Sequence, residues 1–331
     1  MTVGTYVSSC LVLCVEITGQ ENLKTLEIPP SKITEVSASE RDISIKFLTA
    51  RELLNSRRDY FRIPTGSKDI DRILGGGIEQ GAITEFYGEY RTGKTQICLQ
   101  LLLFVTLPVQ LGGMGAQAVF IDTEGNFRPE RIRQMCGRYE VDPTDVLDNI
   151  FVAKAHNTKT QIGLVSELSD FLKDHDVKLL IIDSLTANFR VEYTGEAKLI
   201  ERQQALNRHL NQLAQLSAFA DEEPLAIVFT NQVIGSINKP YLDAPSAVGG
   251  HIIAHASTHR VQLRRASDFA EKVPVLEATL VDSPNLPEST AKFKITEFGI
   301  TDSDNETTRD FKDFLQQVRN KALSEVADNG H

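Results

Sequence analysis

The sequence predicts an α/β fold with a mostly parallel central sheet, and three observations lead to this prediction. From about residue 61 to 300, short apolar runs alternate with longer helical segments, which is the order typical of parallel sheets. A glycine-rich loop at 88–95 joins one apolar run to a helical segment, and the run at 179–183 ends in an aspartate. The expected strands are 82–87, 118–122, 150–155, 179–183, 225–230, 260–264, 275–281 and 292–295.

Four segments follow one another along the chain. Residues 1–46 form a short N-terminal region with a break at two prolines, and residues 47–60 form a linker with a short helix. Residues 61–303 make up the α/β core, and residues 304–331 are a polar, acidic tail. The clearest helix is expected at 197–219, where leucines recur at helical spacing and predict a stripe that faces the core. These leucines are Leu199, Leu206, Leu210, Leu213 and Leu216.

The composition is that of a globular protein. The 331 residues include 45 acidic and 35 basic side chains, for a net charge of -10. This balance argues against a protein that holds nucleic acid by charge over its whole surface, but it leaves room for a local basic stripe. The four cysteines form no CxxC pair, which argues against a disulfide scaffold or a zinc site and favours a reducing, intracellular compartment. The apolar run at 10–15 follows no basic residue and is too short to span a bilayer, so we expect no membrane attachment.

The loop at 88–95 reads GEYRTGKT and matches the phosphate-binding pattern GxxxxGK[ST] at every fixed position. It follows an expected strand and opens an expected helix, which is the context that this pattern requires. Glycines let backbone N–H groups close around phosphates, and the start of the helix adds partial positive charge. We expect Lys94 to reach the β- and γ-phosphates and the Thr95 hydroxyl to coordinate Mg²⁺. The expected nucleotide-binding residues are Gly88, Glu89, Tyr90, Arg91, Thr92, Gly93, Lys94, Thr95 and Gln96.

Polar side chains stand at the ends of three further strands. Asp183 ends a buried-strand pattern, and we expect it to hold Mg²⁺ through water. Glu124 and Gln232 come just past two other expected strands. Because ligands bind at the carboxyl ends of parallel strands, we expect all three groups beside Lys94. A carboxylate beyond the metal ligand can activate water, and an amide near the γ-phosphate can sense it. Taken singly, Glu124 and Gln232 fit a surface loop equally well.

A guanine-specific site would place NKxD late in the sheet. Residues 238–241 read NKPY, which lacks the aspartate and follows no expected strand. The sequence therefore does not favour a GTPase.

Several segments are more distinctive than a generic nucleotide site. They include ITEFYGEYRTGKTQ (83–96), DTEGNFRPERI (122–132), ERQQALNRHL (201–210), GGHIIAHAST (249–258) and VDSPNLPES (281–289). These segments resemble the RecA-like DNA strand-exchange recombinases, the family of archaeal RadA and its eukaryotic counterparts, over about 47–303. The resemblance implies a RecA-like ATPase core, ATP and Mg²⁺ as cofactors, and DNA-dependent ATP hydrolysis coupled to homologous pairing and strand exchange in recombinational repair. It also implies an intracellular location, in the cytoplasm or nucleoid of an archaeon, which GGHIIAHAS favours, or in a eukaryotic nucleus.

The resemblance gives the site residues their roles. Glu124 resembles the residue that activates the attacking water, Gln232 the γ-phosphate sensor and Asp183 the metal-binding carboxylate, so the catalytic set is Glu124, Lys94 and Gln232. Arg131 lies where the family contacts the adenine side of the nucleotide. Asp282 and Pro287 match the cap that the adjacent subunit places over ATP.

The resemblance also implies self-association. Phe47-Leu48-Thr49-Ala50 resembles the FxxA polymerisation motif, in which Phe47 and Ala50 fill two pockets while the segment adds as a strand to the next subunit's sheet edge. The expected assemblies are helical filaments or rings.

Single-stranded and double-stranded DNA are the partners that the family implies, held by two loops. Loop one spans about 190–202 and offers Arg190, Lys198 and Arg202, while loop two spans about 233–249 and offers Lys239. A solvated helix face is an alternative explanation for each of these cations.

The chain departs from the family in three places, and the two departures in the loops favour a second hypothesis. Glu196 stands where loop one usually has an arginine, loop two has no arginine, and residues 1–46 are short for the family's helix–hairpin–helix domain. Each lost phosphate contact should weaken DNA binding and flatten its salt dependence. The alternative is therefore a recombinase paralogue, an ATP-binding mediator of another recombinase's filament. A third hypothesis is a nucleotide-gated interaction module without turnover, and mediator proteins are possible partners of the recombinase itself.

Overall fold

The computed structural model describes residues 49–58, 60–218, 224–234, 246–266 and 273–303. The chain divides into two units, 1–53 and 54–331. Phe47 and Lys239 lie outside the described residues, as do the whole predicted N-terminal region and tail, so the roles expected of them stay predictions.

The described part of the first unit is the start of helix α1 (Ala50–Ser56) in the predicted linker. Thr49 caps this helix, because its hydroxyl accepts a hydrogen bond from the Glu52 N–H at 3.2 Å while the Glu52 carboxylate accepts one from the Thr49 N–H at 2.7 Å. This reciprocal capping box satisfies two N–H groups that have no partner within the helix. The helix therefore starts inside the FLTA segment, and Ala50 is its first residue and is exposed.

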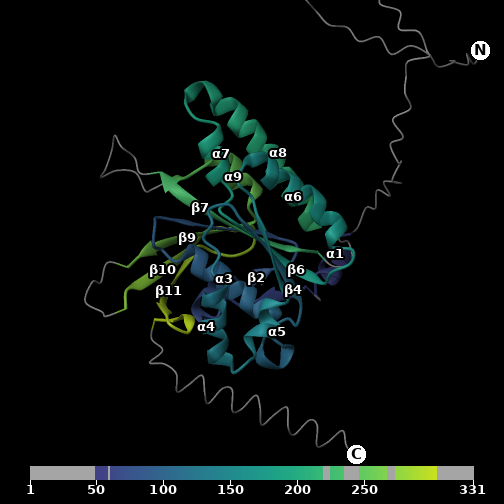
Figure 1. Ribbon diagram of the computed structural model, residues 1–331, viewed down its shortest axis with the longest axis vertical. Helices are drawn as coiled ribbons and strands as arrows, with labels where there is room; N and C mark the ends of the chain where they lie inside the picture. The colour runs from purple at the N-terminus through teal and green to yellow at the C-terminus, as the bar shows by residue number, and fades with distance from the viewer. Residues whose placement is uncertain (1–48, 59, 219–223, 235–245, 267–272, 304–331) are drawn as a thin grey trace, which may run out of the picture. The chain divides into compact units, whose positions relative to one another are not determined.

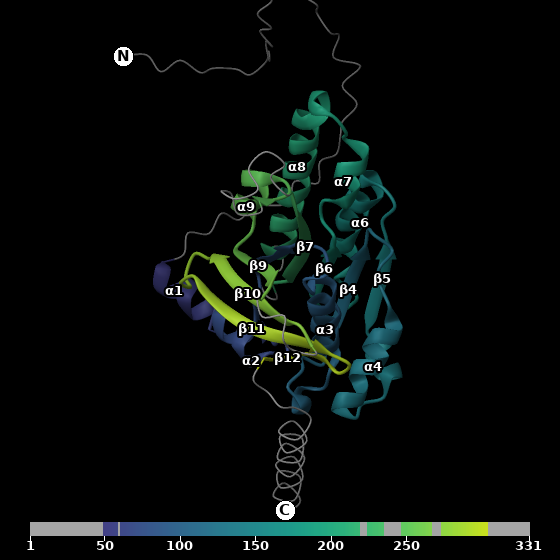
Figure 2. The ribbon, with the colours of Figure 1, turned by 90° about the vertical axis from the view of Figure 1, so that its left-hand side faces the viewer.

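The second unit is built around a ten-stranded sheet (Figure 1). Its main path runs β12-β11-β10-β9-β3-β7-β6-β4-β5, and the strands from β9 to β5 are parallel to their neighbours. The antiparallel strands β10, β11 and β12 extend one edge, opposite β5 (Figure 2). The predicted α/β fold with a mostly parallel sheet is confirmed. The strands are β3 (Ile83–Gly88), β4 (Gln117–Asp122), β5 (Ile150–Lys154), β6 (Val177–Asp183), β7 (Ala226–Ile234), β8 (Ser246–Ala247), β9 (His259–Arg265), β10 (Val275–Asp282), β11 (Ser289–Thr296) and β12 (Gly299–Asp302).

Helices cover both faces of the sheet (Figure 1). On β6, Leu179 and Ile181 pack with helices α2 to α5, whereas Leu180 and Ile182 pack with α6 to α9. This alternation explains the continuous apolar run of the strand, since both of its faces are buried. The helices of this unit are α2 (Lys68–Ile73), α3 (Lys94–Thr106), α4 (Pro129–Tyr139), α5 (Pro143–Leu147), α6 (Thr158–Phe171), α7 (Ala187–Glu192), α8 (Leu199–Ala218) and α9 (Gly250–Ala256), with 3₁₀ turns η2 (Val109–Leu111) and η3 (Glu196–Lys198).

The structure corrects the sequence-based elements in a few places. Strand β7 continues past its predicted end at 230, so Gln232 lies inside a strand and not after one. Leu199 is 39% exposed at the start of α8, while the other four leucines of the predicted stripe are buried. The sequence did not predict the small strand pair β1 (Arg62–Ile63) and β2 (Ile78–Glu79), nor β8 and β12. In the part of the chain that the structure describes, no helix has the length and apolar character to cross a membrane.

Candidate nucleotide-binding site

A cavity of about 560 Å³ opens at the carboxyl ends of β3, β4, β6 and β7. It brings the phosphate-binding loop together with the polar residues that follow or end the neighbouring strands. Its lining residues are Gly88, Glu89, Tyr90, Arg91, Thr92, Gly93, Lys94, Thr95, Gln96, Glu124, Asn126, Asp183, Ser184, Thr230, Gln232 and Val233.

The loop between β3 and α3 has the backbone that its glycines allow. Gly88 passes so close to β9 that a Cβ atom there would lie 2.2 Å from the Leu263 carbonyl oxygen. Gly93 caps α3 in the left-handed region with φ of 93°, which a residue with a side chain adopts only at a cost. The Thr92 hydroxyl donates to the Glu89 carbonyl at 2.8 Å and closes the loop. Backbone N–H groups at the start of a thirteen-residue helix therefore face the cavity, as phosphate binding requires.

Lys94 is held at the mouth of this loop. Its ammonium donates to the carbonyl oxygens of Gly88 at 2.9 Å and Glu89 at 2.7 Å. Burial lowers the pKa of Lys94, and the nearby carboxylates of Asp183 and Glu124 oppose that shift. The lysine is thus a donor in a partly desolvated site, where its attraction to a phosphate is strengthened.

Thr95 and Asp183 form the part of the site that suits a cation. The Thr95 hydroxyl donates to Asp183 Oδ2 at 2.7 Å, and the Thr230 hydroxyl donates to Asp183 Oδ1. Burial raises the pKa of Asp183, and these two hydroxyl hydrogen bonds counteract it. A hydroxyl and a carboxylate are hard oxygen ligands of the kind Mg²⁺ binds, usually together with waters and substrate phosphates. The structured residues contain no cluster of three His, Cys, Asp or Glu side chains fit to hold a metal alone, so this pair fits an ion shared with a nucleotide.

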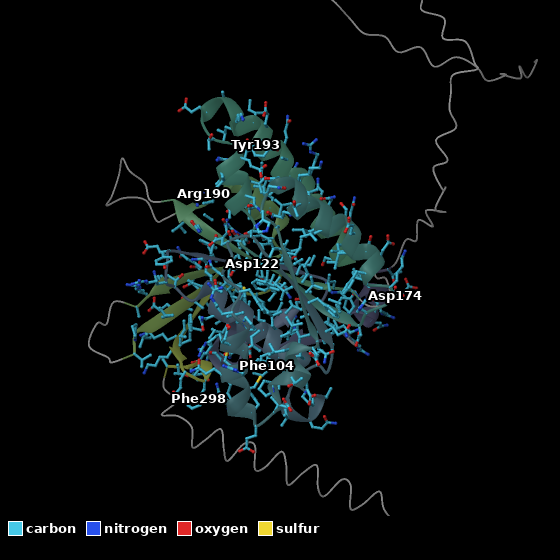
Figure 3. The ribbon with its side chains drawn as sticks, in the orientation of Figure 1. Phe104, Asp122, Asp174, Arg190, Tyr193 and Phe298 are labelled. Carbon is cyan, nitrogen blue, oxygen red and sulfur yellow. The ribbon has the colours of Figure 1, made fainter. Side chains whose placement is uncertain are left out.

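Asp122 builds the turn that presents Glu124. It ends β4 and is 3% exposed, and its Oδ1 accepts the N–H groups of Glu124, Gly125 and Asn126 at 3.2, 2.7 and 3.1 Å. Its Oδ2 accepts the Phe127 N–H at 3.1 Å. One carboxylate therefore closes the whole turn, near the centre of the core in Figure 3.

The Glu124 carboxylate is oriented from three sides. Its Oε1 accepts hydrogen bonds from the Ser184 hydroxyl at 2.8 Å and the Gln232 amide at 3.2 Å, and its Oε2 accepts one from the Asn126 amide at 3.2 Å. The Gln232 carbonyl oxygen in turn accepts from the Arg190 guanidinium at 2.8 Å. Arg190 lies on α7, at the margin of predicted loop one (Figure 3). A continuous chain of hydrogen bonds thus runs from loop one to Glu124.

Comparison with known proteins assigns the chain to a family. A model of the Rad51 family matches residues 56–303. The chain belongs to the Rad51 family.

Curated relatives named "DNA repair and recombination protein RadA" are similar to this Rad51-family chain over most of its length. The protein of Ignicoccus hospitalis is 42% identical over 291 residues, which cover 86% of each chain. The protein of Metallosphaera sedula is 41% identical over 293 residues, or 88% of each chain, and that of Aeropyrum pernix is 44% identical over 267 residues, or 81% of each chain. The matched range of the Rad51 model contains every residue that lines the cavity.

Three other sequence-predicted residues of this Rad51-family chain do not line the cavity, although Arg131 contacts Gln96, which does. The Arg131 guanidinium donates to Gln96 Oε1 at 2.8 Å and to the carbonyl oxygens of Thr296 and Glu297 at 2.6 Å, so it ties α4 to the β11–β12 turn. Asp282 and Pro287 are exposed at the end of β10 and after it. Their predicted nucleotide contacts therefore stay predictions.

The remaining cations lie on loop one. Lys198 ends the η3 turn and is exposed, and Arg202 lies in the first turns of α8 and is half-buried. Loop one is thus largely helical in the described residues, with Glu196 at the start of η3.

Sequence reasoning missed several residues of the site. Asp122, Asn126, Ser184, Thr230 and Val233 were not singled out, although each lies within two residues of one that was. Polar residues at the ends of consecutive apolar runs are the signal that could have found Asp122, Ser184 and Thr230.

Proposed function

We propose that this Rad51-family protein is an ATP-dependent DNA recombinase that forms filaments on single-stranded DNA and catalyses homologous pairing and strand exchange. One observation supports the enzymatic part above all: the phosphate-binding loop, the Thr95–Asp183 pair and Glu124 meet in one cavity. The names of the curated relatives support the recombination part.

Each polar residue of the cavity has its own role in ATP binding or hydrolysis. Lys94 and the loop N–H groups bind the β- and γ-phosphates, and Thr95 and Asp183 hold Mg²⁺, which neutralises phosphate charge when it is bound. Glu124 orients a water molecule and accepts its proton as the water oxygen bonds to the γ-phosphorus. The bond between the γ-phosphorus and the β–γ bridging oxygen breaks, and ADP leaves. Gln232, which donates to Glu124, would exchange this partner for a γ-phosphate oxygen.

DNA binding is coupled to this chemistry through Arg190. Its guanidinium binds the Gln232 side chain, so a DNA phosphate that draws Arg190 away would free the Gln232 carbonyl oxygen and change how its amide meets Glu124. We expect Lys198, Arg202 and Lys239 to contribute further phosphate contacts, which position DNA without reading its sequence.

Assembly completes the active form. Phe47 and Ala50 dock on the next subunit, and the segment 282–287, here called the cap segment, carries Asp282 and Pro287 over the ATP of the adjacent subunit. Modest DNA affinity per subunit is multiplied when linked subunits bind together. Such a protein works with DNA inside the cell.

D-loop formation with and without ATP tests this function. A purified wild-type protein should join a single strand to homologous duplex with ATP, and Lys94→Ala should give no product. A protein that gives no product alone but stimulates a second recombinase would instead be the mediator paralogue, as the Glu196 departure allows. A protein that binds no single-stranded DNA with ATP at moderate salt would contradict both.

A further inference from the structure

A buried polar cluster lies away from the nucleotide cavity, around the carboxylate of Glu79 on β2. Glu79 is 5% exposed and accepts hydrogen bonds from the guanidinium groups of Arg57 and Arg62, the latter at 2.9 Å, and from His259 Nε2 at 3.2 Å. The His259 hydrogen bond, followed by the charges of the two arginines, lowers the pKa of Glu79 to about 2 against the effect of burial. Glu79 is therefore a charged acceptor that holds two donors from residues 57–62 and a third from β9.

His259 extends this cluster to the cap segment. Because the Glu79 carboxylate can only accept, His259 Nε2 carries a proton and Nδ1 faces Ser283 Oγ at 3.1 Å. Ser283 Oγ accepts the backbone N–H groups of Asn285 at 3.3 Å and Leu286 at 3.1 Å, and its hydroxyl donates to Asn285 Oδ1 at 3.1 Å. The single hydroxyl of Ser283 therefore fixes the backbone of the cap segment to a buried histidine.

A second contact holds the same segment. Leu286 is half-buried against the core, and a Cβ atom placed on Gly75 would lie 3.2 Å from its Cδ2. Gly75 has φ of 68°, so both its backbone and the space above it suit glycine. Ser283 and Leu286 thus anchor the cap segment on either side of Asn285, between Asp282 and Pro287.

The other end of the cluster lies in the linker. Arg57 follows α1 directly, just after the segment that carries Ala50. Its neighbour Arg58 is exposed and, among the described hydrogen bonds and ion pairs, makes only a backbone contact to Asn55. The two arginines therefore differ in the bond to Glu79 and in a cation–π contact, since the Arg57 guanidinium lies 5.7 Å from the centroid of the Tyr60 ring.

We propose that the Glu79 cluster is a positioning device that couples the polymerisation linker to the cap segment, with His259 and Ser283 as its positioning residues. The bonds from Arg57 to Glu79 and on through His259 and Ser283 are already made in the single chain. A linker docked on one neighbour keeps Arg57 in this place, and the cap segment is then fixed over the ATP of the adjacent subunit. This inference rests on the proposed function, in which Asp282 and Pro287 act on a neighbour's nucleotide. The coupling concerns ATP affinity within the polymer and not the chemical step.

Ser283→Ala tests the device with the smallest change, and Ser283→Thr is the matched control that keeps the hydroxyl. In DNA-stimulated ATP hydrolysis we expect Ser283→Ala to raise the KM for ATP about three- to tenfold, with kcat within about twofold. The substitution removes every contact of the hydroxyl, but the backbone N–H groups that it held can bond to water instead, so the net effect is about that of one hydrogen bond. Ser283→Thr should keep the wild-type KM. Equal thermal melting of all three proteins excludes a folding defect.

A mixing experiment separates a role in the neighbour's site from a role in the subunit's own site. Ser283→Ala subunits are mixed with an excess of Lys94→Ala subunits, which hydrolyse no ATP but carry an intact cap segment. The KM of the mixture should return to the wild-type value. A KM that stays high would overturn the coupling, because the defect would then lie in the subunit's own site.

The linker end has its own matched pair. Arg57→Ala should raise the KM about two- to fivefold, less than Ser283→Ala because Arg57 is half-exposed and Arg62 remains, whereas Arg58→Ala should leave it unchanged. If Arg57→Ala and Arg58→Ala changed the KM equally, or if Ser283→Ala kept the wild-type KM, the coupling would be overturned while the proposed function would stand. A wild-type protein without DNA-stimulated hydrolysis would overturn the proposed function and the coupling with it.

Discussion

Asp122 offers the sharpest test of how the site is built, because one carboxylate closes the turn that carries Glu124. Asp122→Ala removes the acceptor of all four backbone N–H groups, from Glu124, Gly125, Asn126 and Phe127. Asp122→Asn keeps one carbonyl oxygen, which can stay in the place of Oδ1 and serve the first three groups. Its amide then faces the Phe127 N–H, so one hydrogen bond is replaced by two opposed donors.

The expected losses of folding stability and activity follow from the number of hydrogen bonds that each substitution removes. A hydrogen bond to a charged group contributes about 1.5–3 kcal/mol, and the four are not additive because a freed turn can meet water. We expect Asp122→Asn to lower the free energy of unfolding by about 2 kcal/mol and Asp122→Ala by about 4 kcal/mol. Both should lower kcat, Ala by roughly a hundredfold or more, since a small misplacement of a catalytic group has that effect.

Urea denaturation at pH 7 measures the stability, and DNA-stimulated ATP hydrolysis measures the activity. Asp174→Ala is the control, because it removes an exposed aspartate beyond α6. Equal losses of stability for Asp122→Asn and Asp122→Ala would refute the assignment of three N–H groups to Oδ1 and one to Oδ2. Full ATPase activity in Asp122→Ala would refute the claim that the turn positions Glu124.

Three further predictions concern hydrolysis, assembly and pH. Glu124→Gln should cut DNA-stimulated hydrolysis about 10²- to 10⁴-fold while ATP-dependent DNA binding persists, and a rate equal to that of the wild type would remove the role assigned to Glu124. Phe47→Glu should give monomers, because a charge enters an apolar pocket only at a large desolvation cost. Large assemblies that persist in sedimentation would refute the docking role of Phe47. Burial lowers the pKa of His209 to about 4 from 6.5. As the pH falls, the unfolded chain therefore binds a proton at this histidine at a higher pH than the folded chain does. Stability should therefore fall as the pH drops from about 6.5 to 4, by roughly 3 kcal/mol in all, and the difference between wild type and His209→Gln in urea midpoints at pH 7 and 5 should reveal it.

The loop between β3 and α3 could be predicted to within two residues of the helix start because its chemistry is local, although the left-handed backbone of Arg91 could not. The pattern at 88–95 dictates both the glycine conformations and the start of α3. The β6 strand was equally clear, since burial on both faces leaves a continuous apolar run that ends where the parallel sheet presents Asp183. Because the carboxyl ends of parallel strands meet at one edge, the positions of Lys94, Glu124 and Asp183 along the chain are enough to predict that they share one site.

Features that depend on distant partners could not be predicted in the same way. The end of β7 was placed too early because its last residues pair with β8, as Val233 does with Ala247, and a two-residue strand leaves no periodic signal. Leu199 fits the helical stripe of α8 but lies at its exposed first turn. The bond between Glu79 and His259 joins residues 180 positions apart, and neither residue belongs to a recognisable pattern.

The position of Gln232 inside β7 bears on how the proposed nucleotide signal would reach DNA. A glutamine on a loose loop could sense phosphate without moving anything else, whereas Gln232 is paired in register with Gly88 of the phosphate-binding strand. The two residues that follow it pair with β8, which ends the segment assigned to loop two. Its side chain meets Glu124 on one side and Arg190 of loop one on the other. In the described residues, both loops that we propose for DNA binding therefore connect to the proposed hydrolytic site through Gln232, as a filament that releases DNA after hydrolysis would need.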